Sequence, residues 1–408
     1  MRQAPGERFR REIALRDPSR PRFSVDVVEL ILAEARSAGA SDVHLQPTVE
    51  GLSMRWRIDG VLHEAGLLPR EVAPNVVARL KVLAELLTYR TDVPQEGRIR
   101  GETGDLEMRL STFPTIHGEK AVVRLFAASG GLTRLHDLGL PPEILEVLRR
   151  LLGETSGAVL FSGPAGSGKT TTIYACLRDL VATTEGRRSL ATLEDPVEVA
   201  VAGVAQSQVN LPAGFDLETG LRSLLRQDPE VIAIGEIRDR ATAEVAFQAS
   251  LTGHLVLSTF HAGSAAGAVG RLADMGIEPY LLRSGILAIV SQRLVRKLCD
   301  CSRAVESPSA WLGLPVQGAR QPVGCDACGG TGYRGRLVLA EMLVPDASDL
   351  GRAILSRTDV ARLEQLAVQA GMVTRWDRAC RAIEAGLTSP AEVRRVLGVS
   401  ERIESPLP

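Results

Sequence analysis

The chain has 408 residues, of which 45% are hydrophobic and 24% are charged, and its formal net charge is −1. Such a length and composition predict an ordinary globular protein of two or three domains, and the balanced charge gives no electrostatic reason to expect binding to nucleic acid or to an anionic membrane. No apolar run approaches the length that spans a bilayer, and the N-terminus lacks the apolar stretch of a signal peptide. We therefore expect a cytoplasmic protein, in which clustered cysteines hold a metal more often than they form disulfides.

The first third of the sequence predicts a flexible arm and then a small α+β module. Residues 1–24 are rich in arginine and proline and are expected to form the arm. The module covers residues 25–126, and its expected elements are a helix over 25–39, a hairpin over 52–64 that turns at Asp59-Gly60, a helix over 71–88 and strands over 105–112 and 119–126. Residues 127–134, AASGGLTR, have the composition of a linker.

A second domain is expected over residues 135–408. Its first helix begins at a proline. Short apolar strands are then expected over 158–162, 189–194, 231–236 and 254–260, and they alternate with helices. Strands that are apolar throughout and alternate with helices are typical of a parallel sheet covered on both faces, which places the domain in the α/β class. A cysteine module over 297–336 and a helical tail over 345–408 follow the sheet.

The segment GPAGSGKT fits the phosphate-binding pattern G-x-x-x-x-G-K-[ST], directly after an apolar strand and directly before a helix. Backbone N–H groups of such a loop surround phosphates at the positive end of the helix, Lys169 is expected to reach the β and γ phosphates, and Thr170 is expected to ligate Mg²⁺. A glycine-rich turn with a chance lysine is disfavoured, because the chain has only four lysines. The expected nucleotide-binding residues are Gly163, Pro164, Ala165, Gly166, Ser167, Gly168, Lys169 and Thr170.

Two acidic residues stand at the ends of later strands. Glu194 ends the strand that leads into LEDPVE, and Glu236 ends VIAIGE, where a Walker B carboxylate is expected. One such carboxylate suits the Mg²⁺ shell and the other suits the positioning of an attacking water. The alternative is that both are solvated acids at strand ends.

These segments resemble the secretion ATPase superfamily that drives type II protein secretion and type IV pilus assembly. The resemblance covers nearly the whole chain, except the N-terminal arm and the region of Trp311. Besides the phosphate loop, it covers LEDPVE, LLRQDPEVIAIGEIRD over 224–239, LTGHLVLSTFHA over 251–262, and segments at 40–47, 55–62, 93–99 and 109–126. It implies a RecA-like P-loop ATPase domain preceded by a smaller α+β, PAS-like domain, with a four-cysteine insertion and a helical C-terminal tail.

The resemblance also implies roles for individual residues. Glu194 is implied as the general base or water-orienting residue, and Glu236 as a residue that acts on the Mg²⁺ shell. His254 and His261 match a histidine box that links the γ-phosphate to neighbouring elements, although either could instead be a hydrogen-bonded core residue. Arg109 and Arg124 match arginines that the N-terminal module presents to the nucleotide, although both could instead be solvated on strand exteriors.

In function, the resemblance implies a homohexameric ATPase that uses ATP and Mg²⁺ and sits peripherally at the inner membrane. Its N-terminal module is expected to pack on a neighbouring ATPase domain, and its motion is expected to drive an inner-membrane platform protein that adds pilin-like subunits. Secretion-type members carry a further N-terminal domain that docks on a membrane-bound adaptor, whereas only residues 1–24 precede the first expected helix here, so the adaptor contact is in doubt.

Three other functions compete with this one. A retraction ATPase of the same superfamily is disfavoured, because such members generally lack the cysteine module. A non-hydrolysing scaffold is disfavoured by the presence of Lys169, Glu194, Glu236 and both histidines. A DNA-translocating motor has no support from charge or from aromatic stacking residues, which make up 4% of the chain. We expect no nucleic-acid partner.

The four clustered cysteines are expected to hold one structural Zn²⁺. They occupy the place of a four-cysteine zinc module in the resembling family, and they are Cys299, Cys301, Cys325 and Cys328. The family's first pair is normally C-x-x-C, whereas this chain has C-x-C, and residues one apart in an extended strand point to opposite sides. Both can bind one ion only if Asp300 lies in a tight turn. The alternative is a relic site with free thiols.

Overall fold

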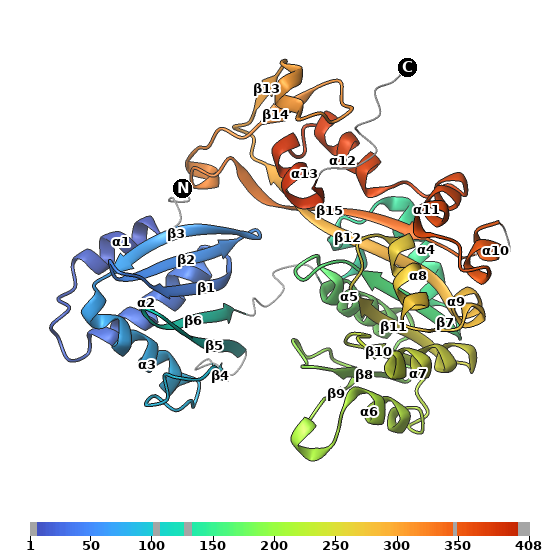
Figure 1. The fold of residues 1–408 in the computed structure, drawn as a ribbon, viewed down its shortest axis with the longest axis horizontal. Helices are drawn as coiled ribbons and strands as arrows, with labels where there is room; N and C mark the ends of the chain where they lie inside the picture. The colour runs from blue at the N-terminus through green and yellow to red at the C-terminus, as the bar shows by residue number, and fades with distance from the viewer. Residues whose placement is uncertain (1–5, 101–106, 126–132, 346–348, 399–408) are drawn as a thin grey trace. The chain divides into compact units, whose positions relative to one another are not determined.

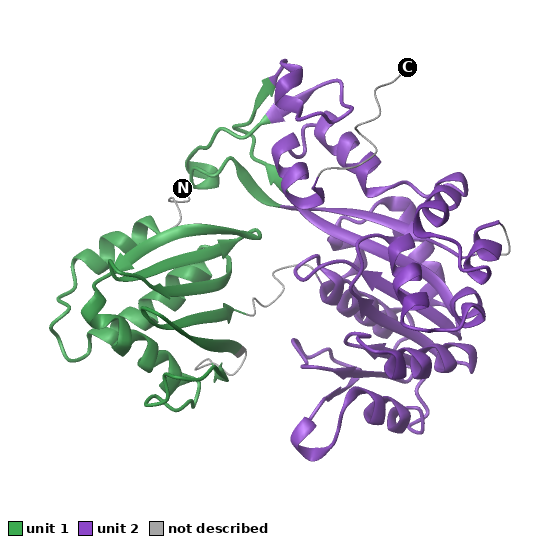
Figure 2. Ribbon diagram, in the orientation of Figure 1, with its two compact units in different colours: residues 1–128, 296–304, 321–335 green, residues 129–295, 305–320, 336–408 purple. Residues whose placement is uncertain are grey.

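A computed structural model describes residues 6–100, 107–125, 133–345 and 349–398 of the chain. The chain divides into two compact units (Figure 2). Unit 1 comprises residues 1–128, 296–304 and 321–335, and unit 2 comprises residues 129–295, 305–320 and 336–408. The sequence places all the cysteines of the module in the second domain, whereas this division groups the two cysteine-bearing segments with the N-terminal unit. Residues 127–132 of the expected linker lie outside the described residues.

Unit 1 is built on a six-stranded sheet whose strands pair in the order β3-β2-β1-β6-β5-β4 (Figure 1). The paired strands run antiparallel. The strands are β1 (Ala40–Pro47), β2 (Leu52–Ile58), β3 (Val61–Leu68), β4 (Gln95–Arg100), β5 (Glu107–Thr115) and β6 (Gly118–Leu125), and the helices are α1 (Glu7–Ala14), α2 (Phe23–Ser37) and α3 (Ala73–Leu83), with a 3-10 turn η1 (Arg70–Val72). The expected hairpin turn is present, because Asp59 and Gly60 both have positive φ angles between β2 and β3.

The expected flexible arm over residues 1–24 contains helix α1 instead. Phe9 on this helix is fully buried, and its ring meets the ring of Trp56 edge-on with centroids 6.3 Å apart. Gly6 caps the helix at a φ of 75°, where a Cβ atom would lie 2.3 Å from the carbonyl oxygen of Ala65. One aromatic anchor and a close backbone contact thus hold a segment whose arginines and prolines resemble those of a disordered tail.

A buried ion pair joins α3 to the sheet of unit 1. The ammonium of Lys81 is fully buried and lies 2.9 and 3.0 Å from the two carboxylate oxygens of Glu119, which is 6% exposed. The same Nζ donates to the carbonyl oxygen of Arg90 at 2.6 Å. Because a buried charge is tolerated when it is paired and hydrogen-bonded, this lysine is structural.

Unit 2 is built on a seven-stranded sheet in the order β15-β12-β7-β11-β10-β8-β9. The pairs from β12 across to β9 run parallel. The strands are β7 (Gly157–Ser162), β8 (Leu190–Glu194), β9 (Ala205–Gln208), β10 (Val231–Ile234), β11 (Leu255–Phe260), β12 (Ile286–Leu298) and β15 (Tyr333–Leu343). The helices are α4 (Pro142–Leu152), α5 (Lys169–Thr183), α6 (Leu217–Leu224), α7 (Arg240–Leu251), α8 (Ala265–Asp274), α9 (Pro279–Gly285), α10 (Asp349–Leu355), α11 (Val360–Gln369), α12 (Arg375–Glu384) and α13 (Pro390–Leu397).

Both faces of this sheet are buried, as the apolar strands predict. Along β7, Ala158 and Leu160 face one hydrophobic cluster, whereas Val159 and Phe161 face another. The first cluster includes residues of α7, α8 and α9, and the second includes residues of α4 and α5. The α/β class and the helical tail predicted from the sequence are confirmed.

The connection from β12 to β15 contains the cysteines and little regular structure. Its elements are β13 (Arg303–Val305), η4 (Pro308–Trp311), β14 (Ala319–Gln321) and η5 (Asp326–Cys328), and further 3-10 turns elsewhere in unit 2 are η2 (Leu135–Leu138) and η3 (Leu211–Ala213). Strands β13 and β14 pair with each other as a separate two-stranded sheet. Because these elements are short, the conformation of this region depends mainly on its turns and on the contacts between its cysteines.

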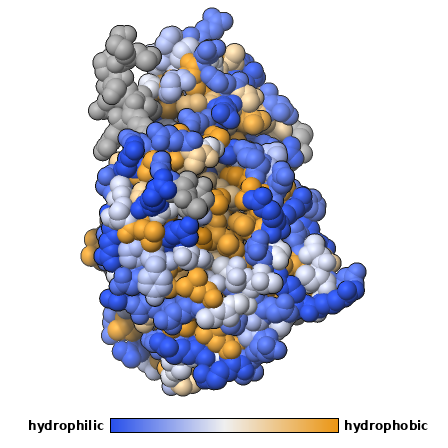
Figure 3. Space-filling model, turned by 90° about the vertical axis from the view of Figure 1, so that its right-hand side faces the viewer, coloured by the Kyte–Doolittle hydropathy of each residue, from blue (hydrophilic) through white to orange (hydrophobic). Residues whose placement is uncertain are grey.

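The surface is mostly polar on the side shown in Figure 3, with hydrophobic residues gathered toward its middle. Among helices within the described ranges, none combines the length and the apolar character that crossing a bilayer requires.

The docking of α1 can be tested by replacing Phe9 with alanine. Because the ring is fully buried, Phe9→Ala is expected to lower the free energy of unfolding of unit 1 by about 3–5 kcal/mol. The measurement is urea unfolding followed by tryptophan fluorescence, since Trp56 contacts the ring. Leu15→Ala, at a position that is 84% exposed just after the same helix, is the control and should change stability by less than about 0.5 kcal/mol. Equal midpoints for both variants would contradict a docked helix.

Candidate active site and cysteine cluster

Parallel pairing brings several strand ends of unit 2 to one edge of the sheet. Ser162, the last residue of β7, is level with Phe260 on β11 and with Ser291 on β12, and Ile234 at the end of β10 is level with Leu193 on β8. The segments that follow these strands therefore meet at the same edge. They include the phosphate loop, the two candidate carboxylates and His261.

The phosphate loop leaves β7 at Gly163 and enters α5 at Lys169. Gly163 has a φ of 148°, and a Cβ atom there would lie 2.5 Å from Ser167 Oγ and 2.6 Å from the carbonyl oxygen of Gln292, so only glycine fits. Ser167 Oγ is buried and has no hydrogen-bond partner among the described residues. A loop that carries an unpartnered buried hydroxyl before a helix N-terminus fits a phosphate ligand.

Lys169 is folded back on its own loop. Its Nζ donates to the carbonyl oxygens of Gly163 at 2.8 Å and Pro164 at 3.0 Å, and the residue is 7% exposed. Burial lowers the pKa of Lys169 and the nearby Arg293 adds to this effect, whereas the charge of Glu236 opposes it. Glu236 and Arg293 thus both lie near enough to Lys169 to act on its charge. Thr170 follows at the start of α5 and is partly exposed.

Glu236 lies between two nitrogen-bearing side chains. One carboxylate oxygen is 2.6 Å from Nε2 of His261 and the other is 2.7 Å from Nε of Arg238. Burial lowers the pKa of His261 and the charge of Lys169 lowers it further, against the opposing effect of Glu236. Because a carboxylate only accepts, Nε2 of His261 carries the proton that bonds to Glu236.

Glu194, the other candidate carboxylate, has a different environment. It is 6% exposed at the end of β8 and accepts hydrogen bonds from Tyr174, Thr192 and Gln206, all of them neutral donors. Its backbone lies beside the loop that carries Glu236, because a Cβ atom on Gly235 would be 3.2 Å from the Cα of Glu194. Sequence reasoning missed its three partners. One feature of the sequence could have pointed to Tyr174 as a residue near the site, namely its position on the helix that follows the phosphate loop.

The structure does not bring His254 to this edge. His254 precedes β11 and His261 follows it, so about seven extended residues, roughly 20 Å, separate the two histidines. Nδ1 of His254 lies 3.2 Å from the carbonyl oxygen of Ala249 at the end of α7. The structure thus places His261, but not His254, beside Glu236, since the strand between the two histidines holds them at opposite edges of the sheet. Its contact is that of a hydrogen-bonded structural histidine.

Arg109 and Arg124 belong to unit 1. They lie directly opposite each other on β5 and β6, with Arg98 of β4 opposite Arg109 on the other side. Arg124 is 65% exposed at its side chain and its Nε lies 3.1 Å from Asp42. The sheet register thus aligns three arginines in one row, which separate sequence segments did not predict.

Arg293 was also missed from the sequence. It follows the parallel part of β12, and its guanidinium donates to the carbonyl oxygens of Gln292 and Gly263, each at 3.0 Å. Burial lowers the pKa of Arg293 to about 10, and the neighbouring Arg375 contributes to the shift. The residue therefore links β12, beside the phosphate loop, to the loop that follows His261. The feature of the sequence that could have identified Arg293 is its position just after the apolar segment of β12.

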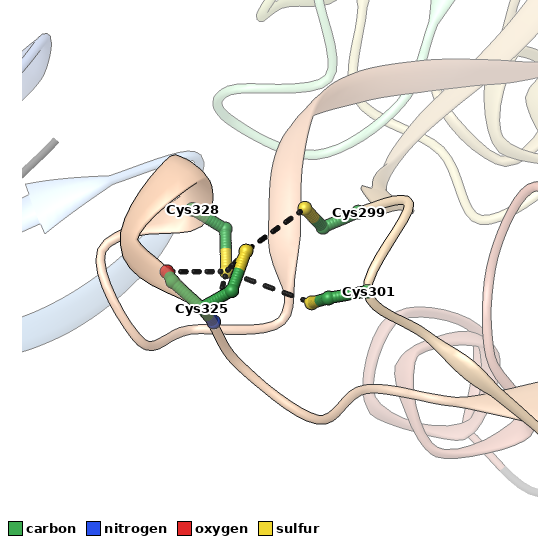
Figure 4. A group of neighbouring side chains, drawn as sticks. All are labelled: Cys299, Cys301, Cys325 and Cys328. Carbon is green, nitrogen blue, oxygen red and sulfur yellow. Dashed lines mark hydrogen bonds between the residues drawn. The ribbon is translucent and has the colours of Figure 1, made fainter. Parts of the chain in front are cut away.

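The four cysteines point toward one another (Figure 4), and their sulfur atoms all lie within 4.8 Å of each other. The amide of Ser302 donates to the carbonyl oxygen of Cys299 at 2.8 Å, so Asp300 and Cys301 form the tight turn that the short C-x-C spacing requires. Burial favours the neutral thiol of Cys328. The amides of Cys325 and Gly332, each 3.2 Å from its sulfur, and hydrogen bonds from the thiols of Cys325 and Cys301 together outweigh burial and lower its pKa to about 6.

The sulfur separations suit a tetrahedral zinc ion. A Zn–S bond of about 2.3 Å in a tetrahedron places the sulfurs about 3.8 Å apart. The pairs Cys299–Cys325 and Cys325–Cys328 are 3.8 Å apart, and Cys301–Cys328 is 4.0 Å apart. The cluster can therefore hold one metal ion, and its four sulfurs leave no open position for catalysis.

Comparison with known proteins decides the family. A family model described as "Type II/IV secretion system protein" matches residues 21–395. The chain belongs to this family. It is 40% identical over 381 residues to the type II secretion system ATPase E of Vibrio cholerae, covering 91% of this chain and 75% of that protein. It is 38% identical over 378 residues to the type IV pilus assembly ATPase PilB of Thermus thermophilus, covering 90% of this chain and 42% of that protein.

Solved structures share the fold of this family member. The ATPase DotB of Legionella pneumophila has a TM-score of 0.67 at 22% identity, covering 93% of this chain and 97% of that chain. The pilus retraction motor PilT with bound ADP has a TM-score of 0.60 at 24% identity, covering 90% of this chain and 96% of that chain. The predicted family and the predicted P-loop ATPase fold with a preceding α+β domain are confirmed.

Metal analysis of the purified protein tests the cysteine cluster. We expect about one zinc ion per chain, and Cys325→Ser should lower the zinc content because the four-sulfur shell loses a ligand. Cys380→Ser is the matched control, since that thiol lies outside the cluster and is partly buried. A substoichiometric zinc content that Cys325→Ser leaves unchanged would instead indicate a relic site with free thiols.

Proposed function

We propose that the chain is an ATP-hydrolysing motor that powers assembly of a pseudopilus or pilus, in type II protein secretion or type IV pilus biogenesis. The observation that carries the proposal is the meeting of Lys169, Glu236 and His261 beside a phosphate loop, at the edge where the parallel strands end. The names of the relatives, a secretion ATPase and a pilus assembly ATPase, supply the class of machine.

The residues of unit 2 supply the parts that phosphoryl transfer to water needs. The loop amides and Lys169 would bind the phosphates. Thr170 and Glu236 would hold Mg²⁺, which would supply positive charge to the transferring group. Glu194 orients the attacking water and takes its proton. His261 contacts Glu236, and Arg293 contacts the loop after His261, so both can pass a change at the γ-phosphate to neighbouring elements.

The assembly is proposed from the same resemblance. The protein acts as a homohexamer in which the N-terminal unit of one chain presents Arg109 and Arg124 to a nucleotide, and ATP hydrolysis drives an inner-membrane platform protein. It binds peripherally to that membrane from the cytoplasm. The cysteine cluster holds structural Zn²⁺.

A retraction motor is the alternative within the family. PilT shares the fold at 24% identity, which bears on architecture alone. The cluster of four cysteines with zinc-like spacing favours assembly, because retraction members generally lack that module.

Lys169→Ala is expected to abolish ATP hydrolysis while the fold is kept. Removing the ammonium takes away the main cationic contact to the phosphates, and the loss in kcat/KM should be at least about 100-fold. Steady-state phosphate release is the measurement, and Lys297→Ala, at an exposed lysine, is the matched control. Retained activity in Lys169→Ala would remove Lys169 from the mechanism.

Glu194→Gln separates a hydrolysing motor from a scaffold. The amide cannot take a proton, so kcat should fall by about 10²–10⁴-fold with ATP binding retained. Equal activity in wild type and variant, or none in either, would favour a non-hydrolysing scaffold.

Arg124→Ala tests whether an arginine of unit 1 acts on the nucleotide. As an arginine that stabilises charge on the transferring group, it should contribute about 10³-fold or more to kcat, with a small effect on ATP binding. Arg70→Ala, at an exposed position of the same unit, is the control. If the arginine acts on a neighbouring chain, mixing Arg124→Ala with Lys169→Ala protein should restore part of the activity, whereas no restoration would contradict action between chains.

A further inference from the structure

The carboxylate of Glu194 has almost no hydrogen-bonding capacity left. A carboxylate offers about four acceptor positions, two on each oxygen. Oε1 accepts from Thr192 Oγ1 at 2.6 Å and from Gln206 Nε2 at 3.0 Å, which fills both of its positions. Oε2 accepts from the hydroxyl of Tyr174 at 2.5 Å, which leaves one position. Among the described residues, no other donor reaches this carboxylate.

The donors themselves are fixed. Tyr174 Oη accepts from the amide of Glu198 at 3.0 Å and from the amide of Val199 at 3.4 Å. With both acceptor positions occupied, its single proton is directed to Glu194. Both N–H groups of Gln206 are engaged, since Nε2 donates to Glu194 and also to the carbonyl oxygen of Val199 at 3.1 Å, and its Oε1 accepts from the amide of Val201 at 2.6 Å.

We propose that Tyr174 is a positioning residue for hydrolysis, which holds Glu194 so that Oε2 is the oxygen that receives the proton of the attacking water. This inference rests on the proposed role of Glu194 as the general base. In the step, a water proton moves to Oε2 as the water oxygen bonds to the γ-phosphorus, and ADP leaves with the electron pair of the broken P–O bond. Tyr174 keeps its own proton throughout.

Two further observations support this role. Tyr174 lies on α5, the helix that begins at Lys169, so the helix that receives the phosphates also carries the donor that sets the carboxylate. Burial raises the pKa of Tyr174 above its ordinary value, and the hydrogen bond to Glu194 raises it further, so the hydroxyl remains a donor at every working pH. The phenol can therefore orient Glu194 without competing for its proton.

Tyr174→Phe removes only the hydroxyl and is the direct test in the full-length protein. Because the carboxylate loses the contact that fixes Oε2, kcat for ATP hydrolysis should fall by about 10- to 100-fold. The KM for ATP and the affinity for a fluorescent ATP analogue should stay within about twofold, since the phosphate loop is unchanged. Tyr280→Phe makes the same change at a tyrosine that is 57% exposed and should leave all three values unaltered.

Glu194→Gln and the double variant distinguish the failure of this inference from the failure of the proposed function. If Tyr174 acts through Glu194, Tyr174→Phe should slow the Glu194→Gln enzyme no further. An inactive Glu194→Gln beside a fully active Tyr174→Phe would overturn the role of Tyr174 alone. An active Glu194→Gln would overturn the role of Glu194 and this inference with it.

Two other outcomes also contradict positioning. A rise in kcat for Tyr174→Phe would make the tyrosine a latch that holds Glu194 away from the water. A parallel loss of ATP affinity and thermal stability would make it a purely structural residue.

If Tyr174→Phe does not fold, 3-fluorotyrosine at position 174 keeps the shape and donates more strongly. Because positioning requires the shape and the donor, both of which are kept, kcat and KM should stay close to those of the wild type. A loss of kcat as large as that expected for Tyr174→Phe would overturn the proposal.

Discussion

Parallel pairing of β7 with β11 and β12, and of β10 with β8, is the constraint on which the candidate site depends. It forces the segments that follow these strands to meet, although Lys169 and Arg293 are far apart in the sequence. The buried, apolar strands make this register costly to change, because a slip of one residue would turn each hydrophobic side chain to the other face. The chemistry at the edge is therefore held by hydrophobic packing beneath it.

The two candidate carboxylates lie at the same edge of the sheet but have different electrostatic surroundings. Glu236 lies beside the guanidinium of Arg238 and within the field of Lys169, surroundings that stabilise negative charge and suit a residue that works near a metal ion. Glu194 is held by three neutral donors, without an ion pair among the described residues. Such a carboxylate is oriented without being neutralised, which suits proton transfer. The division of labour that we propose for Glu236 and Glu194 thus rests on the different hydrogen-bond and ion-pair partners of each carboxylate.

The parts of the fold and site that were predicted from the sequence are those with local signals. The phosphate loop has a fixed spacing between a strand and a helix, and the turn at Asp300 follows from the geometry that C-x-C needs for one ion. Two partners of Glu194 could not be predicted, because Tyr174 and Gln206 come from other elements that only the folded chain brings to it, whereas Thr192 lies two residues away on the same strand. The helix at the N-terminus was missed because Phe9 is its one buried residue among many arginines.

The positions of His254 and of the arginine row show that distance along the sequence does not predict distance in the fold. A motif groups His254 with His261, but an extended strand between them separates the two side chains. Arg98 and Arg109 come from separate segments, but antiparallel register makes them neighbours. Proximity in sequence is a poor guide to proximity in space wherever a strand intervenes.

The scarcity of lysine has a practical consequence for chemical work on this protein. Of its four lysines, Lys81 is fully buried against Glu119, and Lys169 is turned into the phosphate loop. Reagents that acylate amines need an accessible nitrogen, and guanidinium groups do not compete for them. Among lysine side chains, such reagents therefore have Lys297, which is exposed, and Lys120, which is partly exposed, as their accessible targets. Acylation would thus leave the arginine-rich surface charged and label accessible lysine side chains in unit 1, because residues 120 and 297 both belong to that unit.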